Sequence, residues 1–327
     1  MEPKVPRRVS VLIPAYRVTE YISATLNSVL GQTYGDFEII VVNDGCPDTQ
    51  RLEATLAPYR EQIQYYSQSN GGPAAARNLA FSKARGELIG LVDGDDLWSP
   101  DFLQTQIELL EKESVDLVYS DLAVKDRTDT ILGFQRPSGK VTFESLVTMR
   151  DVIPNSAVLA RRASIEDAGA WHSPLRRCED LDLWLRMSSN GARMLCNPKV
   201  LGQYRYRSGS QSFSTIPMLQ ARLDVYRRIS ALPLTKDENA MIDKQLVLTQ
   251  AWLDLDLGKV AIQKKQFREA IHHLTQANRT LNRRKISIAL KISAVLPQAL
   301  WFLHAGSNLR ERLHERRLAA TSTQPLQ

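Results

Sequence analysis

The stretch Leu88-Ile-Gly-Leu-Val-Asp-Gly-Asp-Asp-Leu-Trp98 decides the fold of this chain of 327 residues. Its first five residues form a short apolar run, which is typical of a strand that is buried on both faces. The run leads directly into three acidic residues within four positions, Asp93, Asp95 and Asp96. A buried strand that ends in carboxylates predicts a ligand site at the carboxyl edge of a parallel sheet.

Two earlier stretches have the same form. The run Val9–Ile13 is ended by Pro14, and Glu38–Val42 is followed by Asn43-Asp44-Gly45. Tyr65-Tyr66 begins a further predicted strand. Polar clusters therefore follow several strands, and we expect them to meet at one edge of the sheet.

Helical patterns separate these strands. The apolar positions of Ile22–Leu30 repeat with helical spacing, with Thr19 as the expected N-cap and Gly31 as the expected end. Ala74–Lys83 is a second predicted helix. Alternation of strands and helices predicts right-handed crossovers and a mostly parallel α/β sheet.

The pattern changes to helix from about residue 216 onward, which predicts an α/β domain over residues 1–215 and a helical C-terminal region over 216–327. Positions between Leu257 and Ala277 resemble one tetratricopeptide repeat. Because stable arrays need about three copies and no second copy follows, we expect an ordinary helical hairpin.

The net charge of +6 is unevenly distributed. Residues 283–317 carry eight basic and two acidic residues, and residues 1–215 carry 24 basic and 27 acidic residues. The basic excess is thus local, and it argues against nucleic acid as a partner of the main domain. Three widely spaced cysteines and a charged start without an apolar run predict reduced thiols, no signal peptide and a cytoplasmic protein.

The acidic cluster suggests a metal site. Asp93 and Asp95 lie two positions apart in a turn, and Mg²⁺ or Mn²⁺ is commonly held by one or two carboxylates together with substrate phosphates. A solvated Asp-Gly turn is the alternative for such a pair. We favour the metal because the turn directly follows an apolar strand and a third acid follows it.

Six blocks of sequence, in order, resemble those of family 2 glycosyltransferases over roughly residues 7–212. The blocks are Val9-Ser-Val-Leu-Ile-Pro-Ala-Tyr16, Ile39-Ile-Val-Val-Asn-Asp-Gly45, Asn70-Gly-Gly-Pro-Ala-Ala-Ala-Arg-Asn78, Leu91-Val-Asp-Gly-Asp-Asp-Leu-Trp98, Cys178-Glu-Asp-Leu-Asp-Leu-Trp-Leu-Arg186 and Tyr204-Arg-Tyr-Arg-Ser-Gly-Ser-Gln-Ser212. The resemblance implies the GT-A fold and an inverting transferase that uses a nucleoside-diphosphate sugar, most often a UDP-sugar.

The resemblance also implies a donor site. Pro14, Ala15, Tyr16 and Asp44 would hold the nucleotide base and ribose. Arg77 would lie near the base or the diphosphate. Asp93 and Gly94 would face the ribose or the donor sugar. Asp95 would ligate the Mn²⁺ or Mg²⁺ that bridges the diphosphate.

For catalysis, the resemblance implies Asp180 as the general base, with Glu179 as the competing carboxylate beside it. Acidic residues also favour a helix N-terminus, and both interpretations can hold at once. Arg205 and Arg207 would share a face of a strand and cover the diphosphate, although plain surface charge explains them equally well.

The C-terminal segment Ile286–Ala305 is apolar but interrupted by Lys291 and Pro297, so it falls short of a spanning helix. Its basic flanks within 283–317 fit either contact with a membrane surface or a helix packed on the catalytic domain. We favour the membrane, and hence a peripheral location on the inner face of the cytoplasmic membrane, because acceptors of such enzymes are often lipid-linked.

The sequence therefore predicts a metal-dependent hexosyltransferase that moves a single sugar to a hydroxyl of a glycan or lipid-linked acceptor, as in polysaccharide biosynthesis. A catalytically inactive GT-A domain that serves as a binding module is the alternative. The set Asp44, Asp93, Asp95 and Asp180 argues against it, since drift would have removed a member.

Overall fold

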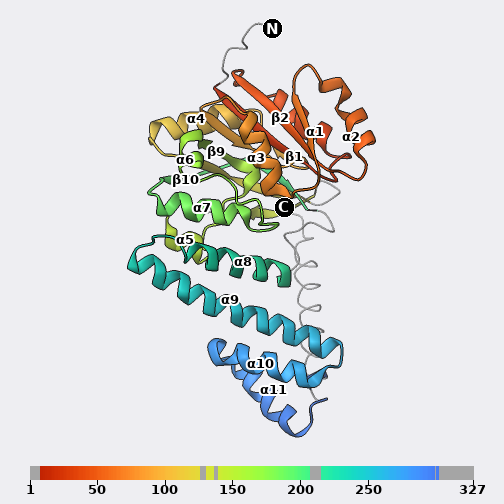
Figure 1. The fold of residues 1–327 in the computed structure, drawn as a ribbon, viewed down its shortest axis with the longest axis vertical. Coiled ribbons are helices and arrows are strands. Elements are labelled where there is room, and N and C mark those ends of the chain that lie inside the picture. The colour runs from red at the N-terminus through yellow and green to blue at the C-terminus, as the bar shows by residue number, and fades with distance from the viewer. Residues whose placement is uncertain (1–7, 126–129, 136–138, 207–214, 299, 302–327) are drawn as a thin grey trace, which may run out of the picture. The chain divides into compact units, whose positions relative to one another are not determined.

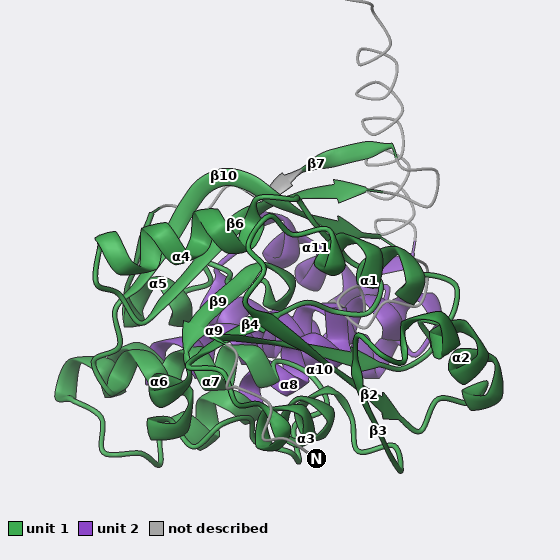
Figure 2. Ribbon diagram, turned by 90° about the horizontal axis from the view of Figure 1, so that it is seen from above, with its two compact units in different colours: residues 1–213, 224–242 green, residues 214–223, 243–327 purple. Residues whose placement is uncertain are grey.

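The computed structural model describes residues 8–125, 130–135, 139–206, 215–298 and 300–301. They divide into two compact units, residues 1–213 with 224–242 and residues 214–223 with 243–327 (Figure 2). The larger unit contains a mixed sheet with helices on its faces (Figure 1).

The sheet has the strand order β3-β2-β1-β4-β9-β6-β10-β5, with β7 paired to β6 and β8 to β10. The strands are β1 (Val9–Ala15), β2 (Phe37–Asp44), β3 (Gln64–Gln68), β4 (Leu88–Leu91), β5 (Leu97–Trp98), β6 (Leu117–Lys125), β7 (Ile131–Gln135), β8 (Lys140–Val141), β9 (Val158–Arg161) and β10 (Met194–Arg205). Along this order the first four strands are parallel. Because β9 is antiparallel to both β4 and β6, β6 and its parallel neighbour β10 run the same way as β4. The expected mostly parallel sheet is confirmed.

The helices of the larger unit connect these strands. They are α1 (Ile22–Leu30), α2 (Thr49–Leu56), η1 (Ala57–Tyr59), α3 (Pro73–Lys83), α4 (Phe102–Lys112), α5 (Phe143–Val147), η2 (Asn155–Ala157), α6 (Arg162–Asp167) and α7 (Glu179–Ser189). Gly31 ends α1 as expected. The expected Thr19 cap is wrong: Tyr21 occupies the N-cap without a side-chain bond, and its backbone N–H bonds to the Val18 carbonyl at 2.8 Å.

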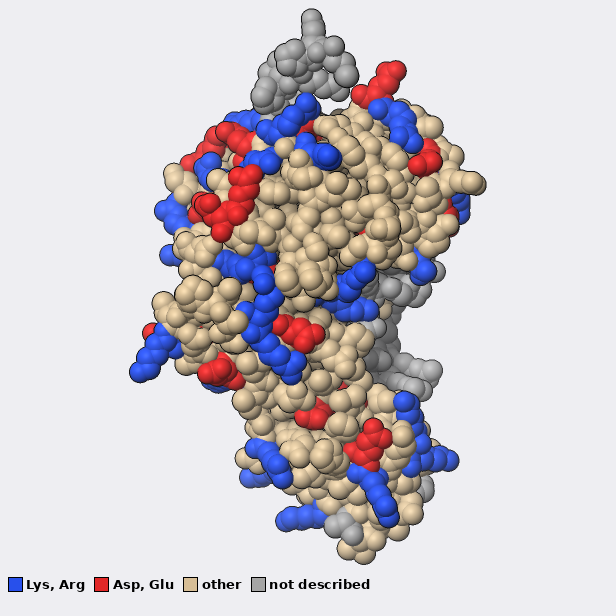
Figure 3. Space-filling model, in the orientation of Figure 1, with Lys and Arg blue, Asp and Glu red and all other residues tan. Residues whose placement is uncertain are grey.

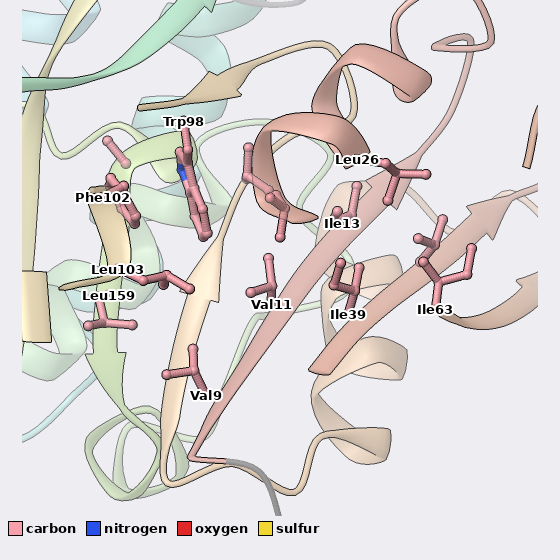
Figure 4. Packing of buried hydrophobic residues seen from close by; sticks show 14 of the residues in the cluster. Val9, Val11, Ile13, Leu26, Ile39, Ile63, Trp98, Phe102, Leu103 and Leu159 are labelled. Atoms are coloured by element: carbon pink, nitrogen blue, oxygen red, sulfur yellow. The ribbon is translucent and has the colours of Figure 1, made fainter. Parts of the chain in front are cut away.

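The core of the larger unit explains the apolar runs. Val9, Val11 and Ile13 lie on one face of β1, on the side where Leu26 of α1 packs (Figure 4). Trp98 stacks on Phe102 with ring centroids 4.1 Å apart. These strands are thereby fixed in register, so the polar residues that follow them reach the same edge of the sheet.

The C-terminal helices are α8 (Thr215–Ile229), α9 (Lys236–Gln263), α10 (Phe267–Leu281) and α11 (Arg284–Val295). The end of α9 and α10 form the expected helical hairpin, packed through Leu255, Ala261 and Leu274 among others. In the part of the chain that the structure describes, no helix has the length and apolar character to cross a bilayer.

Candidate active site

The turn after β4 packs closely against the end of β1. A Cβ atom on Gly94 would lie 2.9 Å from Val18 Cγ2 and 3.1 Å from the Pro14 carbonyl oxygen, so only glycine fits. Asp93 and Asp95 on either side of this glycine are half-buried. The structure therefore brings the acidic turn beside Pro14, as the common strand edge predicts.

Asp96 fixes the position of this turn through hydrogen bonds. Its buried carboxylate accepts hydrogen bonds from the Ser156 hydroxyl and, at 2.9 Å, from the backbone N–H of Arg205. The Ser156 hydroxyl in turn accepts the Asp93 N–H at 3.2 Å, and the Ser156 carbonyl accepts Trp98 Nε1–H at 2.7 Å. Burial, with the nearby charges of Asp95 and Asp93, raises the pKa of Asp96 well above its usual range.

Asp44 at the end of β2 is surrounded by hydrogen-bond donors from the loop that precedes α3. Its carboxylate accepts the backbone N–H groups of Gly71 at 2.7 Å and Gly72 at 2.8 Å, and the Gln68 amide at 2.7 Å. Asn70 donates to the Asp44 carbonyl at 2.9 Å. This buried carboxylate is thus fixed by neutral donors on a neighbouring loop.

Ala15 and Tyr16 lie next to the Asp44 loop. Ala15 ends β1 opposite Asn43, and the half-buried Tyr16 ring lies 5.3 Å from the Arg17 guanidinium. Arg17 donates its backbone N–H to the thiol of Cys46 at 3.1 Å, which ties the loops after β1 and β2 together. The predicted nucleotide residues Pro14, Ala15, Tyr16 and Asp44 are therefore grouped at one edge.

Arg77 on α3 connects the acidic turn to the start of α7. Its guanidinium donates to Asp93 Oδ1 and to Glu179 Oε1, both at 2.6 Å, and its side chain is only 3% exposed. The resemblance implied a position near the base or the diphosphate. In the structure Arg77 lies between two carboxylates and bridges them.

Glu179 and Asp180 begin α7, after Cys178 in a left-handed conformation with φ 54°. Asp180 is half-buried, and one of its oxygens accepts the Leu181 N–H at 2.7 Å. Burial and then the neighbouring charge of Glu179 raise the pKa of Asp180 to about 7, against the opposing effects of the Leu181 bond and Arg77. A carboxyl with this pKa can exchange protons near neutral pH.

The helix that carries these acids is anchored at its next acidic position. The buried Asp182 pairs with Arg186 on α7 and with Arg228 on α8, each at 2.6 Å. Arg186 also donates to the Ala168 carbonyl and, at 2.7 Å, to that of Ala170. The segment that leads into α7 is thus held to the helix itself.

Arg205 lies at the end of β10, with its Nε 3.3 Å from the Asp95 carbonyl oxygen and its guanidinium 5.2 Å from the Tyr21 ring. A shallow hollow beside it is lined by Asp95, Leu97, Lys125, Gln203, Tyr204 and Arg205. Arg205 is thus close to the predicted metal ligand. The predicted partner Arg207 lies outside the described residues.

Three further residues take part to which the sequence analysis assigned no role. Ser156 organises the acidic turn from a loop far along the chain. Asn78 on α3 bonds both backbone groups of Trp171, at 2.6 and 3.0 Å. Arg176, just before α7, donates to Asn70 Oδ1 at 3.0 Å and so links the α7 side of the site to the Asp44 side.

Residues 10–160 match the family model described as glycosyl transferase family 2. The uncharacterized glycosyltransferase RC0461 of Rickettsia conorii is 29% identical over 186 residues, which are 55% of this chain and 31% of that protein. The chain thus spans less than a third of the length of this relative. An Escherichia coli protein, the UDP-Glc:alpha-D-GlcNAc-diphosphoundecaprenol beta-1,3-glucosyltransferase WfgD, is 27% identical over 70% of this chain and 88% of its own length.

Two solved structures share the fold. Residues 1–349 of S. aureus TarS in complex with UDP-GlcNAc superpose with a TM-score of 0.64 at 17% identity, over 92% of each chain. The mannosyltransferase PcManGT from Pyrobaculum calidifontis, in complex with GDP-Man and Mn²⁺, gives a TM-score of 0.60 at 18% identity, over 94% of this chain and 88% of its own. The expected GT-A fold is confirmed, and residues 10–160 of this chain are similar to glycosyl transferase family 2.

Proposed function

We propose that the chain is an inverting glycosyltransferase that moves one sugar from a nucleoside-diphosphate sugar to an acceptor hydroxyl. The observation that carries this proposal is the bridge of Arg77 between Asp93 and Glu179. It joins the acids on the donor side to the helix that presents Asp180. Donor-binding and proton-accepting groups then belong to one connected site, as group transfer requires.

The donor would bind along the edge formed by Pro14, Ala15, Tyr16 and Asp44, with Gly94 allowing close approach. A UDP-sugar is favoured because TarS was solved with UDP-GlcNAc and WfgD is named for UDP-Glc. Arg205 lies beside Asp95, and a guanidinium suits a diphosphate. Asp93, paired with Arg77, would face the ribose or the sugar.

Asp95 is the proposed ligand of Mn²⁺ or Mg²⁺. Its half-buried carboxylate, next to two further acids, is a hard oxygen donor of the kind that these ions take. The described residues hold no group of three or more metal-binding side chains, so substrate phosphates would have to supply other ligands. When bound, the ion would offset charge on the leaving diphosphate.

Asp180 is the proposed general base, and the contacts favour it over Glu179. Glu179 is paired with Arg77 at 2.6 Å. Asp180, with a pKa of about 7, can take a proton near neutral pH. The acceptor hydroxyl would lose its proton to Asp180 while its oxygen attacks the anomeric carbon. The bond from that carbon to the diphosphate oxygen breaks with its electron pair, and the configuration inverts.

We infer that the acceptor is a glycan or a lipid-linked sugar, as in polysaccharide assembly. WfgD is named for an acceptor linked to diphosphoundecaprenol, which supports a lipid-linked acceptor. Such an acceptor would require the protein to act at the inner surface of the cytoplasmic membrane.

Calorimetry with UDP and its sugars, with and without Mn²⁺, tests the donor site. We expect metal-dependent binding and, with a lipid-linked acceptor, release of UDP. Binding without any turnover in a screen of acceptors would favour the inactive binding module. The absence of binding to every nucleoside diphosphate would exclude the proposed donor site altogether.

A further inference from the structure

The helix α11 has two apolar faces, and only one of them is covered. Ile286, Ala289 and Leu290 pack against the hydrophobic cluster of α9 and α10. Ile288, Ile292, Val295 and Leu296 are exposed, by 58%, 42%, 89% and 54%. We call these four residues the α11 apolar face. A helix that is apolar on both sides is expected to cover its second face with something else.

The exposed residues form one continuous surface. Ile288, Ile292 and Val295 follow the spacing i, i+4 and i+7, which places them within about 60° of one another around the helix axis. Leu296 extends the same surface at the C-terminal end of the helix. The surface is therefore a ridge along α11 rather than scattered exposure.

The charged residues of α11 are all positive. Arg284 and Lys291 flank it on one side and Lys285 on the other, and all three are exposed. No acidic residue occurs between Glu269 and Glu311. Figure 3, which shows one face of the molecule, has Lys and Arg side chains, and also acidic ones, over the part that holds α10 and α11.

We propose that the α11 apolar face inserts into the headgroup region of an anionic lipid bilayer, with Arg284, Lys285 and Lys291 on lipid phosphates. An apolar ridge with basic flanks and no acids is the chemistry of an interfacial helix. An acidic protein surface would not need the four apolar side chains, and a second copy of this helix would bring its own positive charges against them.

This inference deepens the proposed function, on which it rests for its purpose, because a lipid-linked acceptor requires the enzyme at a membrane. The sequence left open whether this segment contacts a membrane or packs on the catalytic domain. The covered face of α11 packs on α9 and α10, and the remaining face stays available to a partner.

Vesicle flotation of the full chain tests the proposal. The vesicles are phosphatidylcholine alone or phosphatidylcholine with phosphatidylglycerol as roughly a third of the lipid. We expect the protein to float with the anionic vesicles. The double variant Ile288→Glu, Val295→Glu should lose about tenfold or more in partitioning, because two charges enter the apolar ridge.

Val247→Glu is the matched control. Val247 is 57% exposed on α9 in the same compact unit, outside α11. The control should float like the wild type. Arg284→Glu, Lys291→Glu should weaken binding to anionic vesicles by about fivefold or more for each charge. All these positions are on the surface, and circular dichroism checks the fold of each variant.

Failure of the wild type to float with anionic vesicles would overturn the proposal, as would equal losses in Val247→Glu and the α11 variant. A second alternative is a dimer. If the wild type does not bind vesicles, and sedimentation shows a wild-type dimer that becomes a monomer in the α11 variant, the ridge binds a second copy instead. UDP-sugar binding in solution is measured in parallel. It should be equal in all variants, so a failed ridge and a failed donor site give different results.

Discussion

The carboxylate of Asp44 and a cluster of three carboxylates lie at the same edge of the sheet, and their surroundings are opposite in character. Asp44 is enclosed by neutral donors, including the N–H groups of Gly71 and Gly72. Asp93, Glu179 and Asp180 instead lie together around the guanidinium of Arg77, which bonds the first two. Neutral donors stabilise an ionised carboxylate as a fixed acceptor. Three carboxylates around one cation leave a charge imbalance, which adds to the effect of burial in raising the pKa of Asp180.

The difference separates binding from chemistry. Asp44, held in place by these hydrogen bonds, can orient a nucleotide. Asp180 has a pKa of about 7, raised by burial and by Glu179, so its protonation changes within the working range of pH. The predictions below test whether the two groups differ in this way.

The largest effect is expected from Asp180→Asn. Because only the proton acceptor is lost, transfer should fall by about 10³-fold while the affinity for UDP stays the same. Single-turnover transfer and calorimetry measure the two quantities. Near-normal turnover would remove Asp180 from the role of base.

Asp95→Ala comes next. Loss of the proposed metal ligand should weaken Mn²⁺-dependent binding of UDP by about 100-fold, with little change in binding without metal. Asp101→Ala, at the exposed start of α4, is the control and should bind UDP normally. Unchanged Mn²⁺ dependence in Asp95→Ala would contradict the metal assignment.

Asp44→Asn should weaken UDP binding by about tenfold. The amide keeps one acceptor oxygen and turns its N–H group toward the backbone N–H of Gly71 or of Gly72, so the loop that shapes the nucleotide edge would lose one of its two acceptors. Calorimetry with UDP measures this loss. An unchanged affinity for UDP would remove Asp44 from the proposed donor site.

Glu179→Gln sharpens the comparison further. The glutamine keeps an oxygen for the 2.6 Å bond from Arg77, but it removes the charge that raises the pKa of Asp180. The rate of transfer by the wild type should rise as the pH passes through about 7, since the base must be deprotonated. In the variant this rise should move to lower pH, with less than a tenfold change in the plateau. A rise at unchanged pH would exclude Glu179 as the cause.

Much of this site could be predicted from the sequence. The apolar runs that lead to Pro14, Asp44 and Asp93 have local boundaries, although β1 continues through Pro14 to Ala15, so the position of these residues at one edge follows from parallel topology. The family blocks implied Asp180 as the base by analogy, but the residues themselves did not separate it from Glu179. That distinction depends on which carboxylate the buried Arg77 contacts, and a contact between α3 and α7 leaves no pattern in either segment.

The contribution of Ser156 could not be predicted for the same reason. Its hydroxyl bonds to a turn 60 residues earlier, from a loop without periodicity or motif. The prediction of Thr19 as the N-cap failed because Thr19 lies in a turn in which the Tyr21 N–H bonds to the Val18 carbonyl. The helix begins after this turn. Local signals thus predicted the elements, and the contacts between distant elements determine which side chain does what.

The smallest expected effect concerns the stability of the protein. It tests the raised pKa of Asp180 without any substrate. A carboxyl whose pKa is about 7 in the folded protein and about 3.9 in the unfolded chain binds more protons when folded over the range between these values. Its contribution to stability therefore falls as the pH rises from about 4 to about 7. Asp180→Asn removes this dependence and keeps an oxygen for the Leu181 N–H. Since Asp180 is only half-buried, we expect the variant to melt about 2–4 °C above the wild type at pH 8, with the difference shrinking toward pH 4. Melting curves across this range measure the difference. A difference that does not vary with pH would mean that Asp180 ionises as freely as a surface carboxylate.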